Sequence, residues 1–164
     1  MLRILCVAYL AVLFAGCADD PVVTVPDLES LPTGLTVTYT PPLVEAQQAG
    51  RSGYRYTWTY SISVAATGTP VTIEEFGALG WVDGGWVFRD EQHKTYSAKE
   101  FADKYTCSKA LVLAGKVYTC DDNWSGADKL RPYRCKWYFI GTDERGRRVK
   151  GEAIIEELPR LKKG

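Results

Sequence analysis

The segment from Tyr54 to Val64 alternates more regularly than any other part of the chain. Every second residue is aromatic or aliphatic: Tyr54, Tyr56, Trp58, Tyr60, Ile62 and Val64. The residues between them are Arg55, Thr57, Thr59, Ser61 and Ser63. Because side chains of a strand point alternately to its two faces, this pattern predicts a strand with one face on a core and the other in water. The chain is therefore expected to fold around a β-sheet that contains this strand.

Shorter stretches of the same period, separated by turn residues, predict further strands. They lie at 35–39, 71–73, 116–120, 133–139 and 147–157. The sequence Val82-Asp-Gly-Gly-Trp86 has the composition of a tight hairpin. The parity of the apolar positions changes near Glu74 and Glu75, which predicts a β-bulge there.

These signals favour an all-β domain. About seven short strands with turns between them are typical of an immunoglobulin- or fibronectin III-like antiparallel β-sandwich. Helical spacing within 97–106 adds one short helix. The strand parity places Trp58 and Trp137 inward, so both are expected to be buried.

The first 16 residues have the three parts of a bacterial export signal. Arg3 and the terminal amine are positive, an apolar run extends from Ile4 to Phe14, and small residues precede Cys17. A helix of that length spans only about 16 Å, whereas a bilayer requires roughly 20 residues, so this run is not expected to cross a membrane.

The sequence Leu13-Phe-Ala-Gly-Cys17 resembles the lipobox of bacterial lipoproteins, with Phe14 where that family usually has an aliphatic residue. The resemblance implies that the Cys17 sulfur carries a diacylglycerol, which anchors the chain to a membrane, and that cleavage makes Cys17 the new N-terminus. Ala18 follows Cys17, which by the same resemblance implies the outer membrane, facing the periplasm, in a Gram-negative cell. The expected organisation is a signal peptide (1–16), a lipidated N-terminus and flexible tether (17–34) and a β-sandwich domain (35–164).

From about residue 54 to 157, the order of features is similar to the ApaG family, whose domains have a fibronectin type III-like sandwich. The corresponding features are Tyr54-Arg-Tyr56, Gly68-Thr-Pro-Val71, Trp81-Val-Asp-Gly84, Leu113-Ala-Gly115 and Asp143-Glu-Arg-Gly146. The glycine-rich segment of that family is absent between Asp90 and Lys99, and ApaG proteins are not lipoproteins. The resemblance therefore implies the fold alone, because such folds host many functions.

Charge and residue type weigh against several functional classes. The 20 basic and 20 acidic residues balance, so no overall field attracts a nucleic acid. His93 is the only histidine and lies in a polar stretch typical of a solvated loop, which gives a catalytic triad little support. The chain has no Cys-x-x-Cys pair, and a zinc site is not expected.

Paired carboxylates are the remaining candidates for acid–base chemistry. Glu74-Glu75 and Asp121-Asp122 are such pairs, but neighbours on a strand point to opposite faces and are not expected to converge. The run from Asp121 to Asn123 lacks the full spacing of a calcium loop. No catalytic residue, cofactor or metal is therefore assigned, and the chain is interpreted as more suited to binding than to catalysis.

Three cysteines follow Cys17 in a compartment that favours disulfides. Cys120 and Cys135 are expected on neighbouring strands of a hairpin and form the favoured pair, with Cys107 and Cys120 as the alternative. The cysteine left over is interpreted as a buried thiol. The other possibility is a reactive thiol that crosslinks two chains.

Three tryptophans are candidate partner-binding residues. Trp124 lies in a polar loop, and Trp81 and Trp86 flank a hairpin. Exposed aromatic rings bind sugars or anchor proteins, whereas the alternative is that these rings fold back over the domain. The basic residues between Arg145 and Lys163 are interpreted as a solvated edge strand, with lipid phosphates as the other possible role.

The leading hypothesis is a lipid-anchored, non-catalytic module of the bacterial envelope that binds a protein or an envelope glycan. One alternative is an envelope enzyme acting on peptidoglycan or glycan. The other is a structural lipoprotein that crosslinks through an unpaired cysteine.

Overall fold

The structure, a computed structural model, describes residues 24–48, 51, 53–88 and 95–162. The longer strands are β1 (Leu35–Thr40), β3 (Tyr56–Ala66), β4 (Val71–Val82), β8 (Val117–Ala127), β9 (Tyr133–Asp143) and β10 (Arg148–Leu161). The shorter ones are β2 (Val44–Gln47), β5 (Gly85–Phe88), β6 (Tyr96–Ser97) and β7 (Leu111–Val112). One helix, α1 (Ala98–Lys104), and a 3-10 turn, η1 (Ser108–Ala110), lie between β6 and β7.

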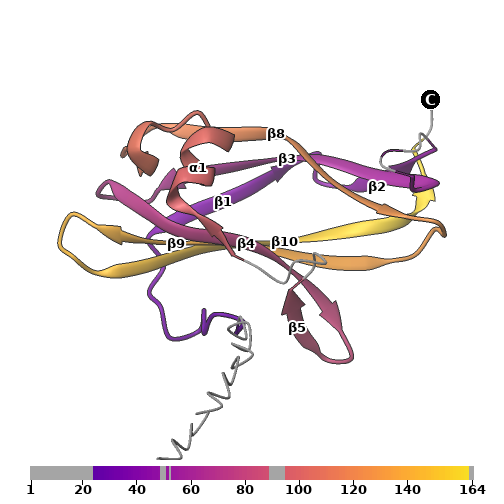
Figure 1. Cartoon of the computed structure of the whole chain (residues 1–164), viewed down its shortest axis with the longest axis horizontal. Helices are drawn as coiled ribbons and strands as arrows, with labels where there is room; N and C mark the ends of the chain where they lie inside the picture. Colours follow the sequence, from indigo (N-terminus) through magenta and orange to yellow (C-terminus); the bar gives the residue numbers. More distant parts are fainter. Residues whose placement is uncertain (1–23, 49–50, 52, 89–94, 163–164) are drawn as a thin grey trace, which may run out of the picture.

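The ten strands of the described chain belong to one mixed sheet that curls into a half-barrel (Figure 1). The order is β1-β3-β2-β10-β9-β4-β5, with β8 paired to β3 and with β6 and β7 paired to β4. The expected all-β fold with one short helix is confirmed. Two separate sheets are not found, because β2 pairs antiparallel with β3 and parallel with β10 and so joins the two halves. Four residues are too few to show a strand period, and the sequence therefore gives no sign of β2.

Strand β3 has the alternation that the sequence predicts. Trp58, Tyr60, Ile62 and Val64 are buried on its inner face. The Trp137 indole of β9 faces the same core and donates a hydrogen bond to the Tyr60 hydroxyl over 3.2 Å. Both tryptophans predicted to be buried are therefore buried.

Phe76 of β4 lies at the centre of an aromatic cluster inside the half-barrel. Its ring centroid is 5.5 Å from that of Phe139 on β9 and 5.8 Å from that of Phe101 on α1. The start of α1 is fixed by a capping box, in which the Ser97 side chain accepts from the Glu100 N–H and the Glu100 carboxylate accepts from the Ser97 N–H. The helix therefore starts at a defined residue and buries Phe101 against the sheet.

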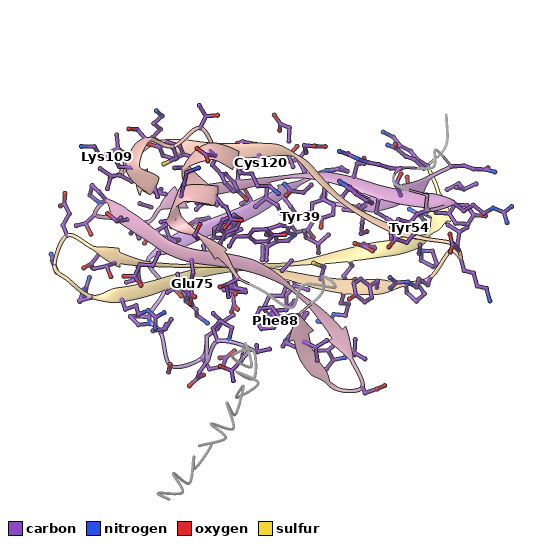
Figure 2. All side chains as sticks on the ribbon, in the orientation of Figure 1. Tyr39, Tyr54, Glu75, Phe88, Lys109 and Cys120 are labelled. Carbon is purple, nitrogen blue, oxygen red and sulfur yellow. The ribbon has the colours of Figure 1, made fainter. Side chains whose placement is uncertain are left out.

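A second, smaller apolar cluster lies on the outer face of β4 and β9. Leu79, Tyr138 and Ile140 of these strands pack there with Phe88 of β5. Figure 2 shows Phe88 on the far side of β4 from Tyr39, which packs against the inner core. These two strands are therefore covered on both faces, unlike the strands of a sheet with one face in water.

The described chain begins on this outer face. Leu28 packs into the outer cluster, and the Gly34 N–H donates to the Lys150 carbonyl of β10 over 2.9 Å. The sequence predicts a flexible tether up to residue 34, and in its described part Leu28 and Leu31 pack against the sheet. Residues 17–23 lie outside the described part, and so does the proposed signal peptide.

Strand β10 is an inner strand, and the expectation of a solvated edge strand is wrong. It pairs with β9 along one edge and with β2 along the other. Lys150 and Glu157 are buried in it. Its buried charges are paired, Lys150 with Glu152 and Glu157 with Ser125, whereas Arg148, Glu156 and Arg160 are exposed.

Candidate functional site

A cleft of about 510 Å³ lies on the open side of the half-barrel, beside the edge of β8 that pairs with no other described strand. The residues along this cleft come from β8, β9, β4, β6 and α1 and from the segments next to β3 and β9. They are Tyr54, Ala78, Tyr96, Lys104, Asp122, Asn123, Trp124, Ser125, Gly126, Arg131, Tyr133 and Trp137. Five of the twelve are aromatic, and two are cationic.

Trp124 is held at the cleft by its neighbours. The Arg51 guanidinium lies 5.0 Å from the centroid of the Trp124 ring, and the Tyr54 ring is 6.3 Å away at a tilt. Figure 2 shows Tyr54 at the end of the molecule where β3 begins. Arg51 also forms a salt bridge of 2.7 Å with Asp122, and this hydrogen-bonded partner lowers the pKa of the Asp122 carboxyl. Asp122 is therefore a poor candidate for a general acid or base near neutral pH.

Two cations in the cleft lie against aromatic rings, and the charge of one of them, Lys104, also acts on Asp122. The Lys104 ammonium lies 5.5 Å from the Trp137 ring centroid, and the Arg131 guanidinium lies 4.2 Å from that of Tyr133. Neither forms a salt bridge within the described residues. Since Asp122 forms its salt bridge with Arg51, Lys104 and Arg131 leave the cleft with a surplus of positive charge, which favours an anionic ligand.

The wall formed by β8 is polar and buried. Asn123 donates from Nδ2 to the Cys120 carbonyl over 2.9 Å, while its buried Oδ1 accepts no hydrogen bond from the described chain. The Ser125 hydroxyl donates to the buried Glu157 carboxylate over 2.6 Å. A register shift opposite Tyr60 and Ile62 breaks the alternation of β8 and turns these side chains inward.

The three tryptophans predicted to bind a partner do not form one surface. Trp124 lies at the cleft, on β8, and the expectation that it lies in a polar loop is wrong because β8 continues to Ala127. Trp81 and Trp86 face each other across the β4–β5 hairpin, with ring centroids 5.0 Å apart. Arg134 lies 5.6 Å from the Trp81 ring on the outer side of the sheet.

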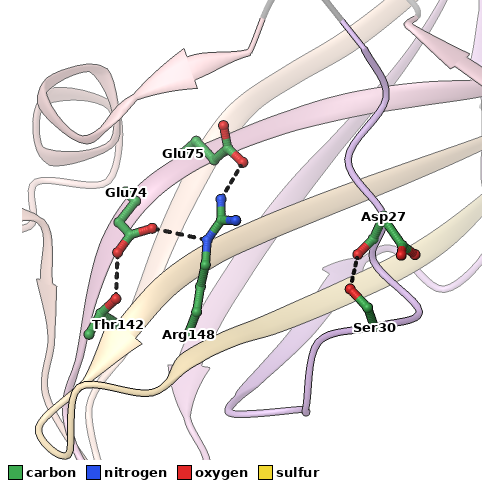
Figure 3. A network of polar contacts seen from close by, with 6 residues as sticks. All are labelled: Asp27, Ser30, Glu74, Glu75, Thr142 and Arg148. Atoms are coloured by element: carbon green, nitrogen blue, oxygen red, sulfur yellow. Dashed lines mark hydrogen bonds and ion pairs between the residues drawn. The ribbon is translucent and has the colours of Figure 1, made fainter.

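Glu74 and Glu75 converge, contrary to the expectation for neighbours on a strand. The predicted bulge is present as a register shift between Ile73 and Glu75, and it brings both side chains to the same arginine. The Arg148 guanidinium is 3.3 Å from a Glu74 oxygen and 3.2 Å from a Glu75 oxygen, and Thr142 also donates to Glu74 (Figure 3). The pair therefore links β4 to β10.

The structure joins neither of the predicted disulfide pairs, and Cys107, Cys120 and Cys135 are buried thiols. Cys120 lies on β8, which pairs with β3, and Cys135 lies on β9, which pairs with β4 and β10. The two strands are consecutive in the chain but are not ladder neighbours. The geometry on which the favoured pair was based is therefore absent.

The burial of these thiols leads to a testable prediction. In the mature protein with Cys17→Ser, a thiol reagent at neutral pH should modify the cysteines slowly in the native state and rapidly in denaturant. Burial also raises the pKa of the Cys107 thiol, which leaves less of the reactive thiolate. Counting modified cysteines by mass spectrometry checks this, with three expected in denaturant. A single modified cysteine in denaturant would instead reveal a disulfide, and a thiol that reacts rapidly in the native protein would favour crosslinking.

The remaining features considered in the sequence are a metal site, a membrane-spanning helix, His93 and Cys17. The part of the chain that the structure describes has no group of three or more His, Cys, Asp or Glu placed to hold a metal. Within those residues, no helix is long and apolar enough to cross a membrane. His93 and Cys17 lie outside the described residues.

The sequence alone does not mark most of the cleft residues as candidate binding residues. Lys104 lies at the end of a short helix, and Arg131 lies in the connection between β8 and β9. Asn123 and Ser125 follow the polar interruption at Asp121, which is typical of a loop. The sequence marks Trp124 as a candidate binding residue, because an aromatic residue among polar ones is conspicuous, and it marks Asp122 and Asn123 only as candidates for other chemistry.

The chain has no match among known families: no family model matches it, and no curated protein matches it. Function is therefore inferred from the residues of the site.

Proposed function

We propose that this chain is a lipid-anchored protein of the bacterial cell envelope whose cleft binds an anionic glycan. The cleft is the observation that carries this proposal. Lys104 and Arg131 supply positive charge and form no salt bridge with the described residues, and the Asn123 Oδ1 supplies an unused acceptor. Aromatic rings such as that of Trp124 pack against the apolar faces of sugars. A carboxylate-bearing sugar matches this combination of charge, hydroxyl donors and ring faces.

The anchor belongs to the same proposal. The lipobox-like sequence ending at Cys17 supports attachment to a membrane, with the outer membrane facing the periplasm as the proposed location. Two or more acyl chains on one cysteine give stable attachment, which one chain does not. The domain would then hold its ligand close to the membrane surface.

The relationship to the ApaG family and to fibronectin III-like sandwiches also remains a proposal. Strands β8, β3 and β1 lie on one side of the core, and β10, β9 and β4 lie on the other. The only described strand that pairs with both halves is the short β2. We infer a sandwich whose two layers have become joined through β2.

The alternatives are an envelope enzyme and a crosslinking lipoprotein. The engagement of Asp122 by Arg51 weighs against acid–base catalysis in the cleft. The burial of the three described cysteines weighs against a crosslink through the folded domain. A binding module is therefore the function that these residues favour.

Calorimetric titration of the protein with oligogalacturonate, a carboxylate-bearing glycan, tests the proposal. Binding should weaken about tenfold in Lys104→Met and again in Arg131→Met, because each removes one charged hydrogen-bond donor worth about 1.5 kcal/mol. The matched control is Arg145→Gln, in the turn between β9 and β10, which should bind like the wild type.

Two comparison ligands identify the chemical class of molecule that the cleft binds. A neutral chitooligosaccharide of the same length should bind more weakly than oligogalacturonate. Equal binding of the two glycans would refute the charge argument. Stronger binding of an acidic peptide such as oligoglutamate would assign the cleft to a protein partner.

A further inference from the structure

The β4–β5 hairpin, Leu79 to Phe88, exposes apolar side chains on both of its faces. Trp81 stands opposite Trp86 on one face, and Trp81 is 38% exposed. Val82 and Val87 lie on the other face and are 44% and 43% exposed. A hairpin with one face in water normally alternates apolar and polar residues. This one has no polar face, which indicates that it contacts something other than water.

The hairpin is rigid enough to present these side chains. Asp83 and Gly84 form its turn with φ angles of 49° and 85°, the left-handed values that a two-residue hairpin turn requires. Its base is held by Phe88, which is buried in the outer cluster with Leu79. The exposed residues therefore project on a fixed support.

The start of the described chain lies on the same side of the sheet. Leu28 and Leu31 pack into the outer cluster with Trp86 and Phe88. Figure 1 shows the segment before β1 and the β4–β5 hairpin projecting from the same side of the layer that contains β9. A lipid at Cys17 would be separated from residue 24 by seven peptide steps, at most about 25 Å of extended chain. An anchor of that reach turns this side towards the bilayer.

The charges around the hairpin fit a headgroup layer. Arg134 lies 5.6 Å from the Trp81 ring centroid and 5.9 Å from that of Trp86. Arginine and tryptophan both favour the interface, where the cation reaches phosphate and the ring remains partly apolar. Asp83 is the only charged residue between Leu79 and Phe88, and it lies at the tip. A charged tip favours a shallow position among headgroups over insertion into hydrocarbon.

We propose that the β4–β5 hairpin rests in the headgroup region of the membrane to which the protein is anchored. This inference rests on the proposed lipid at Cys17. It assigns Trp81 and Trp86 to a lipid surface and leaves Trp124 to the cleft on the open side. The hairpin then fixes the orientation of the domain, which a lipid on a tether alone does not.

Fluorescence quenching of the lipidated full-length mature protein tests this inference. The protein is reconstituted into phosphatidylethanolamine–phosphatidylglycerol vesicles, some of whose lipids carry bromine on the upper part of the acyl chain. Bromine quenches tryptophans that lie close to it. Trp58 and Trp137 are buried in the domain. Quenching is expected in the wild type, and it should be lost when Trp81→Phe and Trp86→Phe are combined.

Two further variants make the result specific. Trp124→Phe is the matched control and should retain the quenching, because Trp124 lies at the cleft. Val87→Asp keeps all the tryptophans and adds a charge at an exposed position, so it should reduce the quenching while the protein still floats with the vesicles.

The outcomes separate the two proposals. Protein that floats with vesicles but is not quenched overturns the hairpin inference and leaves the anchor intact. Quenching that disappears only in Trp124→Phe overturns it as well. Protein that does not float overturns the anchor and this inference with it.

Discussion

Replacing Phe76 with alanine should lower the free energy of unfolding by about 4 kcal/mol, the middle of the range for a buried aromatic residue. Phe76 is fully buried. Five aromatic rings lie around it, with centroids 5.0 to 6.4 Å away: Tyr96, Phe101, Tyr105, Trp137 and Phe139. Removing the ring leaves a cavity and ends all five contacts.

The cavity cannot close easily, because its walls belong to different elements. Phe139 is fixed in the middle of β9, while Phe101 lies on α1, a helix of seven residues. A helix that short has little stability of its own and depends on packing. The loss of Phe76 should therefore also loosen α1, which ends at the cleft residue Lys104.

Urea unfolding followed by tryptophan fluorescence measures the effect. Phe76→Leu is the matched control, because it keeps most of the volume and should cost about 1 kcal/mol. An alanine variant that loses less than about 1 kcal/mol would mean that the surrounding rings collapse into the space. The aromatic cluster would then not be the main support of α1.

Secondary structure and burial are predicted best for segments that contact only one neighbouring layer. The alternation of β3 predicts both the strand and the burial of Trp58, because each side chain experiences either core or water. The bulge at Glu74 also follows from a change of parity. These are local properties, and the chain encodes them within a few residues.

The remaining features depend on contacts between distant segments. Strands β8 and β9 do not pair with each other, because β8 pairs with β3 and β9 pairs with β10. The residues near Cys120 and Cys135 contain no pattern that predicts these partners. The covering of β9 on both faces depends on Leu28, which lies more than a hundred residues earlier. The cleft combines Lys104 with Trp124 and Arg131 through the curl of the sheet, so of these three residues the sequence identifies only Trp124.

Replacing Glu152 with glutamine should lower the free energy of unfolding by about 3 kcal/mol, because it leaves two buried ammonium groups without a counter-charge. Lys136 and Lys150 each place Nζ 3.1 Å from a different oxygen of Glu152. The lysine side chains are only 8% and 11% exposed. One carboxylate therefore forms ion pairs with two cations on neighbouring strands.

The pH dependence of stability should report the same interaction. Burial raises the pKa of Glu152, whereas hydrogen bonds and charge from Lys136 and Lys150 lower it. The lowering is larger, so the net shift of the pKa is downward from 4.5. Around that pH the folded protein binds fewer protons than the unfolded chain. The contribution of Glu152 is therefore complete above its unfolded-state pKa and is lost as the pH falls through the folded-state pKa.

Denaturant unfolding from about pH 7 down to about pH 3 should show a steeper loss of stability in the wild type than in Glu152→Gln. Glu156→Gln is the matched control, because Glu156 is 68% exposed and its oxygen is 3.7 Å from Arg134. Exposed pairs of that kind contribute about 1 kcal/mol at most, so the control should remain close to the wild type. If both variants lost the same small amount of unfolding free energy, groups other than Glu152 would balance the charges of Lys136 and Lys150. The stability of strands β9 and β10 would then not depend on Glu152.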